Sequence, residues 1–172
     1  MKCLKLTSLS IAAIAALSLG TIVLLAQSSR RGEASATIGS AHVSVDYGRP
    51  ILRGRDPLSM LQSGQVWRLG ANTPTTIDSD HDLLFGNTRV PKGKHILLAQ
   101  FVEPGKWVLL ASTKTYDEYD SGAKIAETPM KVENGQDSVN QLTIKLSANG
   151  NQGDLEVSWG TSRLAATFRV AE

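Results

Sequence analysis

The sequence predicts an all-β protein, built as a mostly antiparallel β-sandwich or open barrel of about 8–10 short strands. Three observations predict this class. Beyond residue 36, apolar and polar residues alternate in many short segments, turns rich in Gly and Pro separate these segments, and no segment has a sustained helical period. The expected exceptions are an N-terminal hydrophobic helix and one short helix near residues 57–63.

An apolar run at residues 9–26 carries no charge and follows Lys2 and Lys5, a pattern typical of an export signal. Because about 20 apolar residues cross a bilayer, the length of this run favours an uncleaved membrane anchor. A cleaved signal peptide is the alternative, since small residues suited to cleavage end at Ser28 and at Ala36. A buried core helix is a third interpretation.

The first two interpretations both export the rest of the chain. An uncleaved segment makes the membrane a partner and leaves the domain facing the periplasm or the extracellular side, whereas cleavage yields a periplasmic or secreted protein. We therefore divide the chain into a signal peptide or membrane anchor (residues 1–28), a linker (residues 29–36) and a single β-sandwich domain (residues 37–172). The one cysteine, Cys3, precedes the apolar run, so this domain has no disulfide.

The domain has about 135 residues, enough for one hydrophobic core. Among the 18 basic and 16 acidic residues of the chain, those that precede the domain are Lys2, Lys5, Arg30, Arg31 and Glu33. The domain therefore has one more acidic than basic side chain, and the net charge of +2 comes from the leader. The charge of the domain therefore gives no reason to expect a nucleic-acid partner.

The domain begins with a strand at residues 37–48, in which Val43, Val45 and Tyr47 alternate with polar residues until Pro50. A short helix follows, because Asp56 suits the N-cap and Pro57 the first helical position. Gly64 ends this helix within two turns.

Short strands are expected at residues 75–78, 82–85 and 88–90, the last two joined by a Gly-Asn turn. Residues 95–102 and 106–112 are two apolar strands with Pro and Gly at the centre of the turn between them. We place this hairpin in the middle of the sheet.

Residues 113–122 are polar and irregular, and Pro129 places the strand at residues 125–132 partly at a sheet edge. Clean alternation then predicts three strands, at residues 142–146, 155–159 and 164–170, with turns between them.

Four arginines occur within about twenty residues of one another, and guanidinium groups suit two-point contact with carboxylate or phosphate. They are Arg49, Arg53, Arg55 and Arg68. They could bind an anionic ligand, or they could pin loops by pairing with acids or backbone carbonyls, which is the favoured interpretation.

Tyr47 and Trp67 could stack on a sugar ring or pack in the core, and Asn72 could orient a ligand or bond to its own loop. The structural interpretation is the favoured one for each. The candidate ligand-binding residues are nevertheless Tyr47, Arg49, Arg55, Trp67, Arg68 and Asn72.

No cofactor, metal or catalytic group is predicted. The carboxylates of residues 78–82 alternate as in a calcium loop, but Leu83 replaces the required Gly and Arg89 the closing Glu. The three histidines have no zinc-ligand spacing, and there is no nucleophile elbow or phosphate loop.

The segments at residues 45–50, 54–55, 64–72 and 75–77 resemble, in order and spacing, the bacterial exported family catalogued as domain of unknown function 2911. The segments at residues 90–93, 107–110 and 159–163 also fit, so the resemblance covers about residues 35–170. It implies an exported all-β protein and supplies no activity. Two departures are His95, where an aromatic residue is common, and residues 115–127, which lack the usual Trp-Gly segment.

We expect a non-catalytic module at the cell envelope that binds a small anionic ligand, a carbohydrate or a partner through the candidate residues, because function usually lies on loops beside a rigid scaffold. A carboxylate-dependent hydrolase and a purely structural envelope domain are the alternatives. The hydrolase requires two acids that face each other in a pocket.

Overall fold

The computed structural model describes residues 31–54 and 58–172. In chain order this part contains β1 (Arg31–Ile38), β2 (Ala41–Gly48), β3 (Val66–Trp67), β4 (Thr76–Ser79), β5 (Leu83–Phe85), β6 (Thr88–Val90), β7 (Gly93–Glu103), β8 (Lys106–Ser112), the 3-10 helices η1 (Tyr116–Glu118) and η2 (Ser121–Ala123), β9 (Lys124–Asn149) and β10 (Gln152–Val170). Arg55 and the apolar run of the leader, with the signal or anchor predicted there, lie outside the described residues. In the described part, no helix is both long and apolar enough to cross a membrane.

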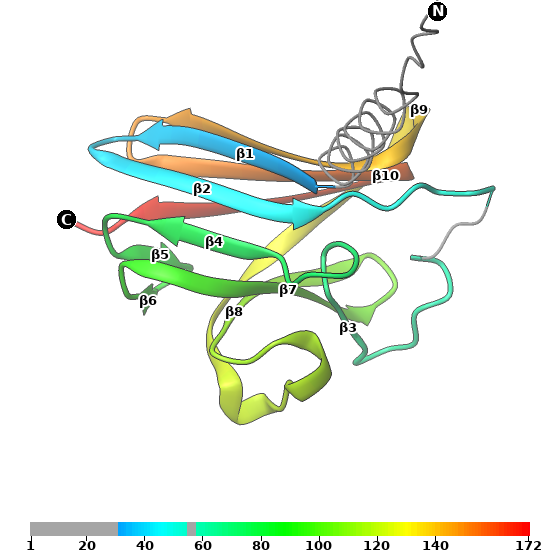
Figure 1. Cartoon of the computed structure of the whole chain (residues 1–172), viewed down its shortest axis with the longest axis horizontal. Helices are drawn as coiled ribbons and strands as arrows, with labels where there is room; N and C mark the ends of the chain where they lie inside the picture. Colours follow the sequence, from blue (N-terminus) through cyan, green and yellow to red (C-terminus); the bar gives the residue numbers. More distant parts are fainter. Residues whose placement is uncertain (1–30, 55–57) are drawn as a thin grey trace, which may run out of the picture. The chain divides into compact units, whose positions relative to one another are not determined.

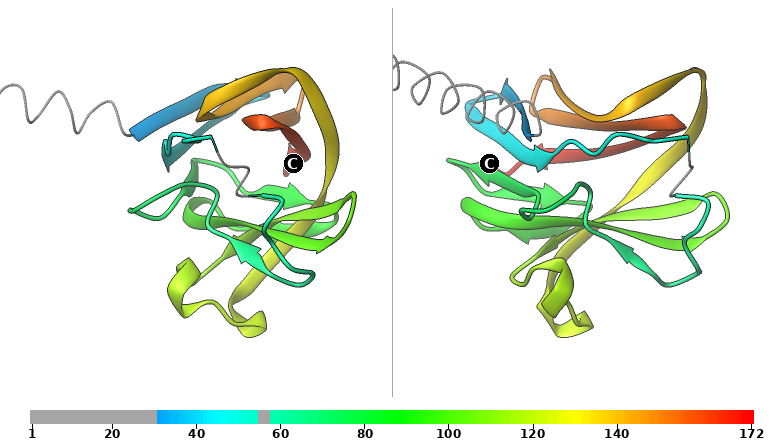
Figure 2. Two further views of the ribbon diagram at one scale, coloured as in Figure 1. Left: turned by 90° about the vertical axis from the view of Figure 1, so that its right-hand side faces the viewer. Right: turned by 45° about the vertical axis from the view of Figure 1, so that its right-hand side comes forward.

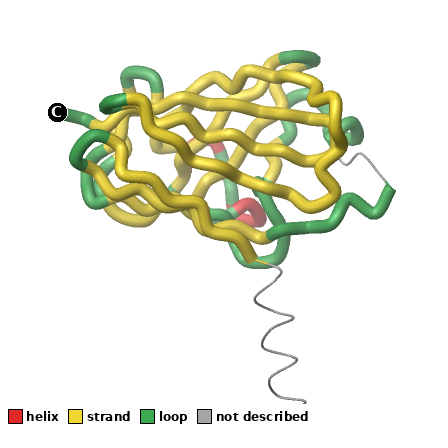
Figure 3. Tube along the Cα trace, turned by 90° about the horizontal axis from the view of Figure 1, so that it is seen from above, coloured by secondary structure: helices red, strands yellow, loops and turns green. Residues whose placement is uncertain are grey.

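Every pairing between these strands is antiparallel, which confirms the predicted all-β class. The strand order is β1-β2-β4-β7-β8-β9-β10-β5-β6, with β3 added beside β7. The sheet is open, because the edge strands β1 and β6 do not pair with each other. Seen from above, strands make up most of the domain and loops lie mainly at its ends (Figure 3).

One sheet makes two layers because its longest strands curve. β9 rises from the layer of β4, β7 and β8 to the layer of β1 and β2, and β10 returns beside it (Figures 1 and 2). Register shifts in β10 at Ser158, Gly160 and Ser162 mark the bend. Bulges of this kind increase strand twist and let a sheet fold over on itself.

The hydrophobic core lies between the two layers. Alternate residues of each strand point into it, as with Val43 and Val45 on β2 and Leu155 and Val157 on β10, all of which are buried. Each fully buried side chain of this size contributes about 1.5–3 kcal/mol relative to an exposed one. The period-two pattern in the sequence therefore predicts the inward face of these strands correctly.

Side-chain and backbone hydrogen bonds join the end of β2 and the residues after it to β9, where a single isolated bridge, Ile51 with Gln141, takes the place of a ladder. We call this contact the seam, formed by residues 47–52 and 140–144. The hydroxyl of Tyr47 accepts from the Ile144 N–H (2.9 Å) and donates to the Ile144 carbonyl (3.3 Å). The Arg49 Nε donates to the Leu142 carbonyl (3.2 Å), and the Leu142 N–H donates to the Pro50 carbonyl (3.0 Å).

Two elements near the start of the domain differ from the prediction. Residues 31–36, expected in the linker, form most of β1 and pair with β2. Residues 58–63 form turns, so the predicted helix near residues 57–63 is wrong for its described part. The segment instead forms a turn, in which the Gln65 N–H donates to the Gln62 carbonyl (3.0 Å), and the Gly64 N–H donates to the Phe101 carbonyl (2.8 Å), which ties the turn to β7.

The last third of the chain also differs. The short strands predicted there merge into β9 and β10, of 26 and 19 residues. Pro129 pairs with Val108 of β8 on one side only, because the ladder between β9 and β10 ends at the next residue, Met130, so this part of β9 is an edge as predicted. The Thr128 hydroxyl donates to the Thr167 carbonyl (3.0 Å), a side-chain bond beside the residue that has no N–H.

Candidate functional site

Tyr47 and Arg49 have structural partners at the seam. Only 3% of Tyr47 is exposed, and both hydrogen bonds of its hydroxyl go to the backbone of Ile144. Arg49 also reaches the Thr143 hydroxyl (3.4 Å), and its own carbonyl accepts from the Gln141 side chain (3.3 Å). Tyr47 and Arg49 therefore hold the end of β2 against β9, as the structural interpretation of these residues expects.

Trp67 is buried among other tryptophans. Its ring stacks on Trp159, with 6.1 Å between the centroids and 4° between the planes. The Trp107 ring meets it edge-on at 6.2 Å and 78°. Such aromatic pairs contribute about 0.5–1.5 kcal/mol beyond the area that they bury, so Trp67 fixes β3 in the core.

Close backbone packing positions the loop that follows β3. A Cβ on Gly48 would lie 2.0 Å from the Ala71 carbonyl oxygen, and one on Gly70 would lie 3.0 Å from the Gly48 carbonyl oxygen. The Thr75 hydroxyl donates to the Leu69 carbonyl (3.0 Å) within the same loop. Leu69, which is fully buried, has a φ of +52°, a conformation that costs a branched residue free energy and that the packing maintains.

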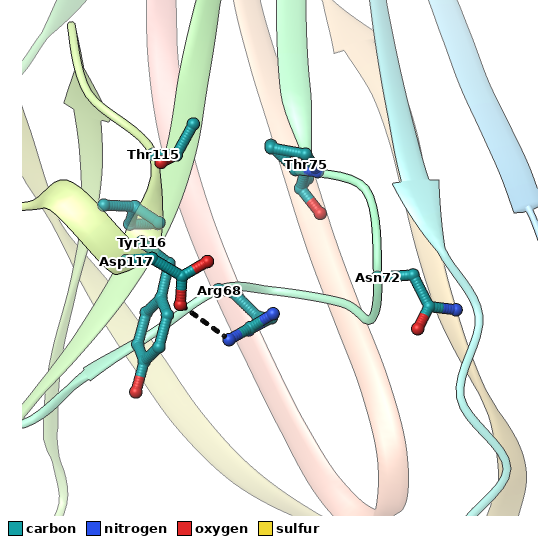
Figure 4. Close-up of a pocket in the computed structure, with 8 residues that line it drawn as sticks. Arg68, Asn72, Thr75, Thr115, Tyr116 and Asp117 are labelled. Atoms are coloured by element: carbon teal, nitrogen blue, oxygen red, sulfur yellow. Dashed lines mark hydrogen bonds and ion pairs between the residues drawn. The ribbon is translucent and has the colours of Figure 1, made fainter.

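Arg68, between the buried Trp67 and Leu69, reaches the surface and meets the loop after β8. Its guanidinium carbon lies 4.5 Å from the centroid of the Tyr116 ring, and its Nη2 donates to an oxygen of Asp117 at 3.2 Å. Figure 4 shows this pair with the Tyr116 ring beside it and Asn72 on the far side of a small pocket. Tyr116 and Asp117 belong to η1, so the contact joins two segments about fifty residues apart in the sequence.

A pocket and a groove adjoin this contact. The pocket is lined by Arg68, Asn72, Pro74, Thr75, Leu98, Thr115, Tyr116 and Asp117 and has a volume of about 20 Å³, room for about one water molecule. The groove is lined by Leu61, Gln65, Val66, Tyr116, Asp117 and Tyr119 and has a volume of about 560 Å³. Ligand sites measure about 300–1,000 Å³, so the groove has the size of a binding site and the pocket does not.

Contacts within the loop at residues 113–123 hold the two tyrosines of the groove in place. Lys114 forms an ion pair with Asp120, which raises the pKa of Lys114 and lowers that of Asp120. The Thr113 N–H donates to the Ala123 carbonyl (2.9 Å), which closes the loop at its base. Burial raises the pKa of the Tyr119 hydroxyl, so this group stays protonated and can both donate and accept.

The structure thus brings two of the six candidates, Arg68 and Asn72, to one pocket, and it gives Tyr47, Arg49 and Trp67 other partners. The sixth, Arg55, is outside the described residues. Sequence reasoning missed the groove residues of the irregular loop. The available signal was two tyrosines three residues apart, Tyr116 and Tyr119, in a polar segment between strands.

Two of the three acids of residues 78–82 are held by protein groups. Asp80 accepts from the His42 N–H (2.8 Å) and lies 2.8 Å from the His81 Nδ1, and Asp82 pairs with Arg89 and accepts from the Lys92 N–H (2.7 Å). Among the described residues, no group of three or more His, Cys, Asp or Glu side chains is arranged to hold a metal ion.

Comparison with known proteins gives one match. A family model described as "Protein of unknown function (DUF2911)" matches residues 29–168, a span that runs from the start of β1 almost to the end of β10. No curated protein and no solved structure matches the chain.

Proposed function

This chain belongs to the DUF2911 family of proteins of unknown function, and we propose that it is a non-catalytic binding module of the cell envelope. Its ligand occupies the groove beside Arg68. The observation that carries this proposal is a groove of about 560 Å³ that is lined by Tyr116 and Asp117, the two residues that Arg68 contacts. An Arg, an aromatic ring and a carboxylate together provide donors, an apolar face and acceptors for a polar ligand.

The ion pair of Arg68 and Asp117 leaves both groups available to a ligand. The side chains are 35% and 75% exposed, and surface pairs of this kind contribute about 0–1 kcal/mol. A ligand can therefore replace one of its contacts at low cost. Tyr47, Arg49 and Trp67 support binding indirectly, since they fix the strands from which the groove loops extend.

The lining of the groove argues against the hydrolase alternative. Glycoside hydrolysis by two carboxylates needs acids about 5–9.5 Å apart across the bond that breaks. Asp117 is the single acid among the described residues that line the groove, and Arg68 holds it as an ion pair. A purely structural role predicts that Arg68 only fastens the loop at residues 113–123.

Substitution of Arg68 distinguishes a role in ligand binding from a purely structural role. Purified domain is screened by thermal shift against cell-wall fragments, anionic sugars and nucleotides, and the ligands that shift the unfolding temperature are titrated by calorimetry. We expect Arg68→Gln to weaken binding about tenfold or more, because a charge-assisted contact is lost, and to change the free energy of unfolding by less than about 1 kcal/mol.

Arg89→Gln is the matched control, since Arg89 forms a similar exposed ion pair, with Asp82, away from the groove. It should bind as wild type does. Loss of stability in Arg68→Gln with no ligand detected for wild type would leave the structural role as the explanation.

The apolar run at residues 9–26 supports the envelope location. Ala36 lies within β1, so cleavage there would remove most of a core-packed strand, whereas cleavage after Ser28 would leave β1 whole. Fractionation of cells and N-terminal sequencing test this location, and recovery of the protein from the cytoplasm with an intact leader would contradict it.

A further inference from the structure

Resting on the proposed function, we infer that the ligand of the groove is an uncharged carbohydrate chain, and that Arg68 and Asp117 act on it as a donor and acceptor pair. The groove could otherwise take an anion, as four clustered arginines in the sequence suggest. The surroundings of Arg68 decide between these two ligand classes.

The charge beside the groove is negative. Among the described residues at this loop, the cations Arg68, Lys114 and Lys124 are already paired, with Asp117, Asp120 and Glu127. Glu118, which is exposed on the same loop, adds a further negative charge. A bound anion would face this excess at short range, where like charges cost free energy. An uncharged ligand does not incur this cost.

The groups that line the groove match the surface of a sugar. One face of the Tyr116 ring is covered by the Arg68 guanidinium, and Tyr116 still has 40% of its surface exposed although it is a large aromatic residue. An exposed aromatic ring offers an apolar face for the C–H groups of a pyranose ring, while its edge remains polar. Tyr116 is therefore the expected stacking platform.

The polar groups occur in combinations suited to neighbouring hydroxyls. In the groove, Asp117 accepts, the Gln65 side-chain NH2 donates while its oxygen accepts from the Gln62 N–H (2.7 Å), and the protonated Tyr119 hydroxyl does both. Arg68, which contacts Asp117 and Tyr116 next to the groove, adds donors. Each vicinal pair of sugar hydroxyls likewise donates and accepts. The two walls come from separate segments, residues 61–66 and residues 116–119, so a chain lying between them contacts both.

Binding of matched oligosaccharides to the full-length protein tests this inference. The uncharged probes are cellohexaose, xylohexaose and chitohexaose, the charged probe is hexagalacturonate, and affinity is measured by calorimetry. We expect at least one uncharged probe to bind, and its affinity to change by less than about threefold between low and high salt, because no net charge is neutralised.

Three variants assign the contacts. Tyr116→Ala should weaken binding of the uncharged probe about tenfold through loss of stacking, and Tyr116→Phe should retain it. Asp117→Asn replaces the charged acceptor with a neutral one, so it should also weaken binding of the uncharged probe, by about tenfold.

The outcomes separate this inference from the proposed function. Binding of hexagalacturonate alone, strengthened by Asp117→Asn and weakened by salt, would overturn the uncharged ligand and keep the groove as a binding site. Binding of an uncharged probe that Tyr116→Ala leaves unchanged would place the ligand elsewhere and overturn both. Failure of every uncharged probe would overturn the inference, and failure of the wider ligand screen as well would overturn the proposed function.

Discussion

The Tyr47 hydroxyl satisfies both backbone groups of Ile144 where β9 has no neighbouring strand. A buried N–H or carbonyl without a partner costs about 1–3 kcal/mol. We therefore expect Tyr47→Phe, which removes one oxygen atom, to lower the free energy of unfolding by about 1–3 kcal/mol. Urea unfolding followed by fluorescence measures this change.

Tyr116→Phe is the control for this prediction, because it removes the same atom from an exposed tyrosine in η1. It should change stability by less than about 0.5 kcal/mol. Equal effects of the two substitutions would show that the seam does not depend on the Tyr47 hydroxyl.

Residue chemistry was predictable where it depends on neighbours in the sequence. The loop-pinning interpretation anticipated that an arginine would bond to a backbone carbonyl, and Arg49 does so, but the acceptor, Leu142, is ninety-three residues away and no local pattern identifies it. Tyr116 and Asp117 were missed for a related reason. They gain significance only because the fold carries Arg68 to them.

At the scale of elements, the turn between β4 and β5 confers a dependence on pH. The His81 side chain and the His42 N–H hold the pKa of Asp80 below its usual value, and the Arg89 side chain and the Lys92 N–H do the same for Asp82. A pKa that is lower in the folded state gives stability that is present above the unfolded-state value and lost as the pH falls through the folded-state value.

We therefore expect stability to decrease below about pH 4. The variant with Asp80→Asn and Asp82→Asn should show a smaller decrease over the same range, because it lacks the two carboxylates. Urea midpoints measured from neutral to acid pH test this expectation. A double variant as sensitive to acid as wild type would contradict it.

Strand positions were predicted better than strand lengths. Alternation identified residues 155–159 and 164–170 as strands, and both belong to β10. The break expected at Gly160-Thr161 does not occur, because Gly160 takes a φ of +60° in a bulge and pairs with Val139. Residues 31–36 of β1 fall in the predicted linker and residues 37–38 in the predicted strand, and the pairing of all eight with β2 makes them one strand.

At the scale of the whole molecule, one sheet folded into two layers makes the domain a single cooperative unit. β1 contributes Ala34 and Ala36 against the core and covers the edge of β2. We expect a chain that starts at Arg31 to unfold in one sharp transition. A chain that starts at Thr37 should be less stable and prone to self-association, because it exposes an unpaired edge.

Thermal unfolding and light scattering of these two chains check this prediction. A second shortened chain, which ends at Val170 and loses only the two residues after β10, is the control for shortening. A chain from Thr37 that matches the longer one in stability and stays monomeric would show that β1 is dispensable.

At the seam, the exchange of one backbone amide, the Ile144 N–H, reports on local motion. The Ile144 N–H bonds to a side-chain hydroxyl, whereas the N–H groups inside the ladders of β9 and β10 bond to backbone carbonyls. Rotation of the Tyr47 ring out of its site would expose this amide to solvent without separating any pair of strands. Its hydrogen–deuterium exchange rate therefore reports how often the Tyr47 hydroxyl leaves Ile144 and the seam between β2 and β9 opens, apart from global unfolding.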